Sequence, residues 1–236
     1  MNRLVIGTTN DFYPYNFKDN KTFDGYDIEL CRDLANYYHI QAEFQSYKGV
    51  QDLMSAVKNN EVDLIVAGLA VTNKRRTLLD FIHPYAKFSS YSLLVDSQYQ
   101  NLKNWEELDR PNIVIGVARD SASEDIGKTI FKKATVMTYN GETETAQAIL
   151  KKEADALIRN QYWCKAFRMR HSDKVCILEP ELGKPTSLGI AVKKHNDELT
   201  YKISSFLWKY MGTDVQRKVY NKWFDKIDTS LLASEL

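Results

Sequence analysis

One stretch of the chain combines small residues with groups that can hold an anion. It reads Ala67-Gly68-Leu69-Ala70-Val71-Thr72-Asn73-Lys74-Arg75-Arg76 and follows an apolar segment at 62–66. The small residues allow a ligand to approach the backbone closely. Thr72 offers a hydroxyl and an N–H, and Arg75 offers a rigid fork of donors that fits a carboxylate at two points. The stretch therefore predicts a grip for a small anion, although a surface ion pair for Arg75 and a helix N-cap for Thr72 are the alternatives.

Alternating strands and helices must position this stretch. Apolar residues at helical spacing alternate with short apolar segments, a pattern typical of α/β proteins with mostly parallel sheets flanked by helices. The predicted strands are 3–7, 41–46, 62–66, 113–117, 135–139, 154–158, 175–178 and 187–193. The predicted helices are 26–38, 50–58, 121–131, 142–151, 160–170, 197–211 and 214–224. Ser121 or Asp120 can serve as the N-cap of the helix at 121–131.

The pattern occurs twice along the chain. Residues 53–65 align with 145–157, and alanine, glutamate and aspartate fall at matching positions. Each copy reads as a helix, a tight polar turn and a buried strand, so two lobes of similar build fit better than one continuous sheet. The helices predicted at 197–211 and 214–224 have a broad apolar face and no catalytic pattern, and we expect them to pack on one lobe.

Composition restricts the possible partners. The chain has 236 residues, 44% of them hydrophobic, and a formal net charge of +1. We therefore expect a packed core and no nucleic-acid partner. No apolar run reaches the roughly 18–20 residues that span a bilayer. No signal peptide precedes the first predicted strand, so either the protein is cytosolic or a leader was removed.

The cysteines do not suggest a metal site. Cys31, Cys164 and Cys176 form no CxxC pair and no zinc-type Cys/His spacing, so we expect neither a metal nor another cofactor. Cys31 falls on the apolar face of a predicted helix. Cys164 and Cys176 are either two separate thiols or, in an oxidising compartment, a disulfide, and spacing alone does not decide between these.

Short motifs in a fixed order give the chain a family resemblance. Together they resemble the bacterial extracellular solute-binding proteins of family 3, the polar amino-acid type. The motifs are Leu4-Val5-Ile6-Gly7-Thr8, Tyr13-Pro14, Phe23-Asp24-Gly25-Tyr26-Asp27-Ile28-Glu29-Leu30, Asp63-Leu64-Ile65-Val66-Ala67-Gly68, Thr72 with Arg75, Asp80-Phe81 with Pro84-Tyr85, Ile115-Gly116-Val117 and Gly189-Ile190-Ala191-Val192 with Trp223-Phe224.

The resemblance implies a two-lobed α/β clamshell of the type II periplasmic binding fold. Lobe one would comprise residues 1–89 and 188–236, and lobe two residues 90–187, with hinge strands near 90–95 and 185–191. A ligand that touches both lobes would stabilise a closed state. The implied protein is a monomeric component of an ABC importer that captures a small amino acid or related carboxylate and meets a membrane permease. Its location would be periplasmic, or extracellular and membrane-tethered.

Two other functions are compatible with the same resemblance. A few similar proteins are dehydratases of prephenate or arogenate, and Asp120 or Glu179 would then be the candidate acid. A ligand-sensing module of a larger protein is the other alternative. The dehydratase is not favoured, because no histidine lies in a recognisable nucleophile motif and we expect no catalytic residues.

The resemblance also assigns roles in lobe one. Arg75 would clamp the ligand carboxylate, with help from Thr72 and from the backbone at Gly68. Ala70 stands where the family often has a serine. Asp11 is one candidate partner for a ligand cation.

Aromatic residues would form the walls of the lobe-one site. Tyr13 is the best placed of them, and Tyr47 can replace the aromatic residue that the family often has at Val50.

Lobe two departs from the family pattern. Asp120-Ser121-Ala122 takes the place of the usual Gly-Thr-Thr run at a helix N-terminus, where Ser121 keeps a hydroxyl and the helix keeps its N–H groups. Asp120 either meets a ligand cation or only caps the helix. Asn160 stands where the family usually has the aspartate that meets an α-ammonium, and an amide brings no charge. An ordinary α-amino acid is therefore in doubt as the ligand.

Overall fold

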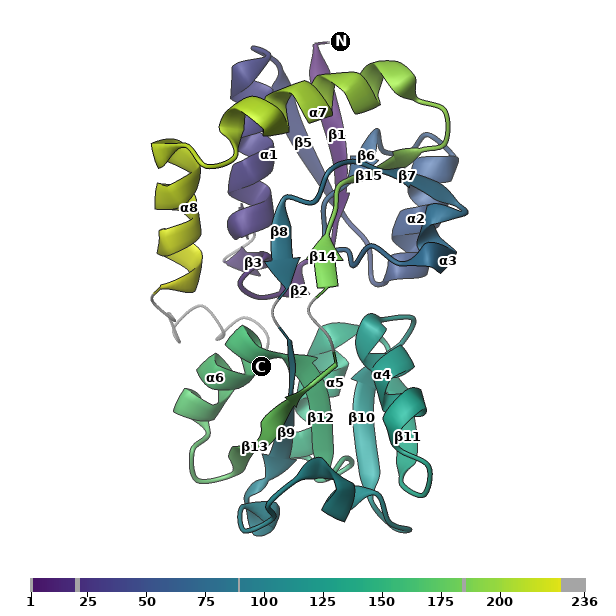
Figure 1. The fold of residues 1–236 in the computed structure, drawn as a ribbon, viewed down its shortest axis with the longest axis vertical. Helices are drawn as coiled ribbons and strands as arrows, with labels where there is room; N and C mark the ends of the chain where they lie inside the picture. The colour runs from purple at the N-terminus through teal and green to yellow at the C-terminus, as the bar shows by residue number, and fades with distance from the viewer. Residues whose placement is uncertain (1, 20–21, 89, 184–185, 226–236) are drawn as a thin grey trace. The chain divides into compact units, whose positions relative to one another are not determined.

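The chain folds into two compact α/β units (Figure 1). The computed structural model describes residues 2–19, 22–88, 90–183 and 186–225. Within that part, unit 1 comprises the residues up to 88 and those from 186 onward, and unit 2 comprises residues 90–183. Each unit has its own five-stranded sheet.

The sheet of unit 1 has the strand order β5-β1-β6-β15-β7. β1 (Arg3–Thr8) lies between β5 (Gln41–Ser46) and β6 (Leu64–Ile65) and is parallel to both. β15 (Ala191–Lys193) is antiparallel to both of its neighbours, β6 and β7 (Leu79–Phe81). The α/β class predicted from the sequence is confirmed.

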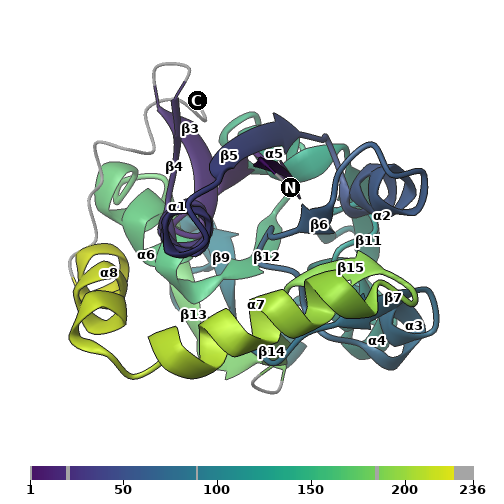
Figure 2. The same ribbon diagram turned by 90° about the horizontal axis from the view of Figure 1, so that it is seen from above.

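The sheet is covered by the apolar faces of α1 (Tyr26–Tyr37), α2 (Val50–Lys58) and α7 (Asp197–Tyr210). α8 (Asp214–Phe224) packs against α1, and the short α3 (Asn73–Arg76) has no buried residue. The α2 side of the core is formed by Leu53, Met54, Ala56, Val57, Val62, Ile65, Ala67, Leu69, Leu79 and Ala191. Figure 2 views α1 end-on, with α7 running from the side of β15 toward α8.

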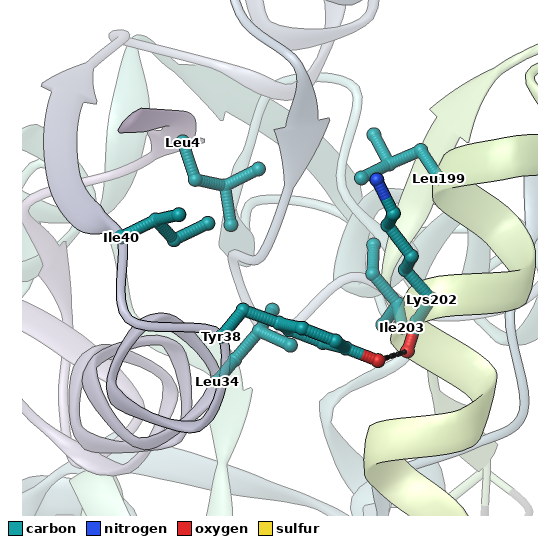
Figure 3. Close-up of a pocket in the computed structure, with 7 residues that line it drawn as sticks. All are labelled: Leu4, Leu34, Tyr38, Ile40, Leu199, Lys202 and Ile203. Atoms are coloured by element: carbon teal, nitrogen blue, oxygen red, sulfur yellow. Dashed lines mark hydrogen bonds between the residues drawn. The ribbon is translucent and has the colours of Figure 1, made fainter. Parts of the chain in front are cut away.

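The tail packs on unit 1 through specific polar contacts as well as apolar ones. The Tyr210 hydroxyl donates to Asp33 Oδ2 at 2.8 Å, and Trp223 Nε1 donates to Glu29 Oε1 at 3.0 Å. A cavity of about 120 Å³ remains between the start of β1, the end of α1 and the start of α7 (Figure 3). Its lining combines aliphatic side chains with Lys202 and Tyr38, and the Tyr38 hydroxyl donates to the carbonyl of Lys202 at 2.8 Å.

Several short strands of unit 1 were not predicted. β2 (Asp11–Phe12), β3 (Asn16–Asp19) and β4 (Thr22–Asp24) form a separate small sheet, and β8 (Ala86–Phe88) pairs with β14 (Thr186–Leu188). The single strand predicted at 187–193 is wrong: it is divided into β14 and β15, which belong to different sheets. The break includes Gly189, where a Cβ would lie only 2.8 Å from Val71 Cγ2.

Unit 2 repeats the topology of unit 1. Its strand order is β11-β10-β12-β9-β13, and β10 is parallel to β11 and β12, whereas β9 is antiparallel to both of its neighbours. The strands are β9 (Tyr91–Asp96), β10 (Val114–Ala118), β11 (Thr135–Tyr139), β12 (Ala156–Asn160) and β13 (Val175–Leu182). The helices are α4 (Ala122–Ile130), α5 (Gly141–Leu150) and α6 (Gln161–Arg170), with short 3-10 turns at Ser97–Tyr99 and Trp105–Leu108.

The predicted sequence repeat has a direct structural basis. Asp63 Oδ2 accepts the N–H of Val5 at 2.7 Å, and Asp155 Oδ2 accepts the N–H of Val114 at 2.8 Å. The residue three positions before each aspartate has a left-handed backbone, with φ of 59° at Asn60 and 58° at Lys152. Each aspartate thus ties its strand to the neighbouring parallel strand, β1 in unit 1 and β10 in unit 2.

The cysteines are free thiols. Cys31 is buried, as predicted, and so is Cys164, whereas Cys176 is half-buried. For Cys164 and Cys176 the structure therefore has the first of the two alternatives, separate thiols. In the described ranges no helix is both long enough and apolar enough to cross a membrane.

Candidate functional site

The anion-grip residues of unit 1 follow β6 at the carboxyl edge of the sheet. In open α/β sheets, ligands bind outside this edge, where the strand order reverses. β1 and β6 are adjacent, and their connections leave in opposite directions, to β5 and toward β15. Gly68 has φ of 55°, and a Cβ there would lie 2.4 Å from Cε1 of Phe12. Only glycine fits both conditions, so Gly68 lets the chain pass under the Phe12 ring.

The structure brings Ala70, Thr72 and Arg75 together. Thr72 is the N-cap of α3, and its Oγ1 accepts the N–H of Arg75 at 3.2 Å. Arg75 Nη1 donates to the carbonyl of Ala70 at 2.9 Å. The backbone and one arm of Arg75 are therefore fixed, which orients the guanidinium. Arg75 is half-buried whereas Arg76 is exposed, so a simple surface role fits Arg76 better.

Asp27 holds this loop in place, and the sequence reasoning missed it. Its carboxylate is fully buried, and Oδ2 accepts the N–H of Gly68 at 2.6 Å and Nδ2 of Asn16 at 2.9 Å. Oδ1 accepts the Tyr85 hydroxyl at 2.7 Å. A signal was present, since Asp27 shares the apolar face of its helix with Cys31 and Leu34, at positions i, i+4 and i+7.

Burial raises the pKa of Asp27 from 3.8 to about 6, and the three hydrogen bonds oppose this rise only in part. Native Asp27 therefore binds its proton more tightly than the unfolded chain does, so its contribution to stability falls as pH rises from about 4 to about 6. The difference between the two pKa values corresponds to about 3 kcal/mol.

An asparagine at position 27 resembles the protonated acid in shape but does not ionise, so it makes no pH-dependent contribution to stability. We expect the free energy of unfolding of the native chain, minus that of Asp27→Asn, to decrease by about 3 kcal/mol across this window and then level off. Urea denaturation from pH 4 to pH 7.5 measures it. A difference that stays constant or rises with pH would contradict the raised pKa.

The other residues predicted for lobe one have packing roles in unit 1. Tyr13 is buried, and its ring centroid lies 5.3 Å from that of Phe17. Tyr47 and Val50 pack against the α2 side of the core, where β5 ends and α2 begins. Asp11 is half-buried on β2. Their contact with a ligand stays a prediction.

Ser121, and not Asp120, caps α4. The Oγ of Ser121 accepts the N–H of Glu124 at 3.3 Å, while the N–H of Asp120 is bound by Glu124 Oε2 at 2.5 Å. Asp120 has φ of 57°, which places it in the turn before the helix, with an exposed side chain. The alternative in which Asp120 only caps the helix is wrong.

Asn160 is the N-cap of α6 and is buried. Its Oδ1 accepts the N–H of Trp163 at 2.8 Å. An asparagine amide has a single acceptor atom, so the other end of this side chain is an NH₂ donor group. Asn160 in place of the usual aspartate therefore removes the negative charge and also replaces an acceptor oxygen by a donor group.

Comparison with known proteins places the chain in a family. Residues 4–226 match the bacterial extracellular solute-binding proteins, family 3. The chain belongs to this family. The loops that carry Arg75, Ser121 and Asn160 are therefore loops of a solute-binding protein.

Relatives cover nearly the whole length of this solute-binding protein. The arginine-binding extracellular protein ArtP of Bacillus subtilis (strain 168) is 27% identical over 228 residues, which are 94% of this chain and 86% of ArtP. An ancestral arginine-binding protein solved with bound arginine is 28% identical, with a TM-score of 0.86 over 95% of this chain and 99% of that one. The ancestral amino acid-binding protein AncCDT-1, described as a precursor of cyclohexadienyl dehydratase, is 25% identical, with a TM-score of 0.85 over 94% and 96% of the two chains. The type II periplasmic binding fold implied by the sequence is confirmed.

Proposed function

We propose that this solute-binding protein captures a small amino acid or related carboxylate and delivers it to the permease of an ABC importer. The loop from Gly68 to Arg75 carries the proposal, because hydrogen bonds within the protein fix its conformation. Asp27 holds Gly68, and the carbonyl of Ala70 holds Arg75. A guanidinium oriented in this way binds a carboxylate with little loss of side-chain entropy. The amino acid bound by the ancestral arginine-binding protein supports the ligand class.

Unit 2 would contribute from its own carboxyl edge. Ser121 follows β10 and Asn160 ends β12, two neighbouring parallel strands of that sheet, and each residue caps a helix. We propose that they contact the ligand, together with Asp120. Asp11 remains the acid proposed for a ligand cation, and Tyr13, Tyr47 and Val50 remain proposed wall residues.

We also propose a location and an assembly state, and membership of the family supports both. The protein would be a monomer outside the cytoplasmic membrane, either periplasmic or tethered to the cell surface. Hinge closure on the ligand also belongs to the proposal. Small-angle X-ray scattering, with and without the ligand found below, tests closure and the monomeric state, since a closing monomer becomes more compact at constant mass.

A ligand screen tests the function. Ligands that bind only the folded state raise its stability by mass action. We expect at least one of the common amino acids, their 2-oxo and 2-hydroxy analogues or short peptides to raise the melting temperature, with binding confirmed by calorimetry. Failure of all of them in both measurements would overturn the proposal.

Charge at position 160 should control binding of an α-ammonium. Asn160→Asp keeps one oxygen for the N–H of Trp163 and turns the donor end into a carboxylate oxygen. We expect Asn160→Asp to raise the affinity for α-amino acids about tenfold or more, because hydrogen bonds to charged groups are worth about 1.5–3 kcal/mol. Titration calorimetry with an α-amino acid and its 2-hydroxy analogue measures the change. The affinity for the analogue should not rise, because the analogue has no ammonium group.

Asn196 provides the matched control. It caps α7 in unit 1 by the same kind of bond, Oδ1 to the N–H of Leu199 at 3.3 Å. Asn196→Asp should leave ligand affinity unchanged. An equal gain in both variants would show that the added charge acts at long range and not at the site.

A dehydratase activity is the second candidate, and the description of AncCDT-1 as a dehydratase precursor is the observation that favours it. The candidate acids, Asp120 and Glu179, both have exposed side chains, whereas catalytic acids are usually shielded from water. We therefore expect no phenylpyruvate from prephenate. Turnover that Asp120→Asn or Glu179→Gln abolishes would establish the enzyme instead.

A further inference from the structure

Arg159 is a buried cation that the carboxylate grip does not use. It lies near the end of β12, is 2% exposed and precedes Asn160. Its Nε lies 2.9 Å from Glu142 Oε2, and its Nη1 donates to the carbonyl of Glu142 at 3.0 Å. Its Cζ lies 3.5 Å from the centroid of the Trp163 ring. Residues from α5, β12 and α6 thus hold this guanidinium in a single orientation.

One arm of Arg159 has no partner. Nη2 is buried and has no hydrogen-bond partner in the part of the chain that the structure describes. A buried N–H without an acceptor costs about 1–3 kcal/mol, more when the group is charged, so native structures rarely keep one unless it serves a purpose. Here it lies at the carboxyl edge of the parallel strands, where α/β sheets bind ligands.

The chemistry of this place selects its occupant. Glu142 balances the charge of Arg159, so no further anion is needed for neutrality. The group left over is a donor only, because a guanidinium has no acceptor atom. A cationic group on the ligand would find no acceptor at Nη2 and would be repelled by the positive charge of the Arg159 guanidinium. An oxygen acceptor, as in an amide carbonyl or a carboxylate, completes the set.

We infer that Nη2 of Arg159 forms, within unit 2, a donor subsite for an oxygen-bearing group of the ligand. The inference rests on the proposed function and narrows its substrate class. The preferred ligands are carboxylates whose side chain ends in an amide or an acid, whereas cationic side chains bind poorly. This differs from the arginine named for ArtP.

Calorimetry with L-glutamine, L-glutamate, L-alanine and L-arginine tests the subsite. We expect glutamine or glutamate to bind at least tenfold more tightly than alanine and arginine. In the double variant Arg159→Met with Glu142→Gln, which leaves no buried charge unpaired, this advantage over alanine should disappear while alanine binding stays the same. Arg168→Met, which changes an exposed arginine of α6, should leave every affinity unchanged.

Two further variants keep the test decisive if the double variant does not fold. Arg159→Lys retains a cation beside Glu142 but lacks Nη2. Its affinity for glutamine should be about tenfold lower than that of the native protein. Glu142→Gln leaves the charge of Arg159 unbalanced and should shift the preference from glutamine toward glutamate. Arginine binding more tightly than glutamine, or an Arg159→Lys protein with native affinities, would overturn the subsite alone. If none of the four amino acids binds, the subsite fails, whereas the proposed function is decided by the wider ligand screen.

Discussion

Replacing Arg75 by alanine is expected to lower the affinity for the ligand carboxylate by about 100-fold or more. Each hydrogen bond between charged partners contributes about 1.5–3 kcal/mol, and a guanidinium fork makes two of them with one carboxylate. The ligand-dependent rise in melting temperature should then vanish, because too little ligand is bound. Calorimetry and thermal shift, both with the best ligand from the screen, measure the loss.

The neighbouring arginine supplies the control. Arg76 belongs to the same short helix but is exposed, so Arg76→Ala should change the affinity by less than about twofold. Arg75→Lys keeps the charge but not the two-point fit, and should lie between the native protein and Arg75→Ala. Equal effects of Arg75→Ala and Arg76→Ala would refute the grip.

The second large effect is expected at Asp27. Asp27→Ala should lower the free energy of unfolding by about 4 kcal/mol, because three buried donors lose their acceptor at about 1–3 kcal/mol each. These are the N–H of Gly68, Nδ2 of Asn16 and the Tyr85 hydroxyl. Ligand affinity should fall as well, since Gly68 begins the loop that carries Arg75. Urea denaturation at pH 7 gives the first value and calorimetry the second.

A milder variant separates the hydrogen bonds from general damage to the core. Tyr85→Phe removes one of the donors and no volume beyond the hydroxyl, so we expect a loss of about 1 kcal/mol. Its effect on ligand affinity should be small, because the Gly68 bond remains. If Asp27→Ala cost no more than Tyr85→Phe, the buried carboxylate would not be what holds the loop.

The sequence alone predicted the repeated framework correctly. The strands at 41–46 and 135–139 and the helices at 50–58 and 214–224 have the predicted bounds. These elements have clear apolar periodicity, and periodicity is a local property that the chain displays without its partners. The repeat was visible for a related reason: Asp63 and Asp155 occupy the same place in two copies of one local turn, each bound to the neighbouring parallel strand.

The short strands could not be predicted in the same way. β2 has two residues and β8 has three, too few for any period to appear. Such strands exist only because another segment supplies their hydrogen bonds, as Thr186–Leu188 does for β8. The break at Gly189 has the same origin, because continuous β propensity from 187 to 193 says nothing about a change of sheet partner.

The amino-acid sequence by itself determined the residue types of the grip, the helix that Asn160 begins and the family to which the chain belongs. Only the tertiary structure decided which group caps α4, what holds Gly68 and where Arg159 finds its counter-charge. The partners of Asp27 lie 11, 41 and 58 residues away along the chain. A buried charge must be compensated, but the fold alone determines which distant segment brings the compensating group within reach.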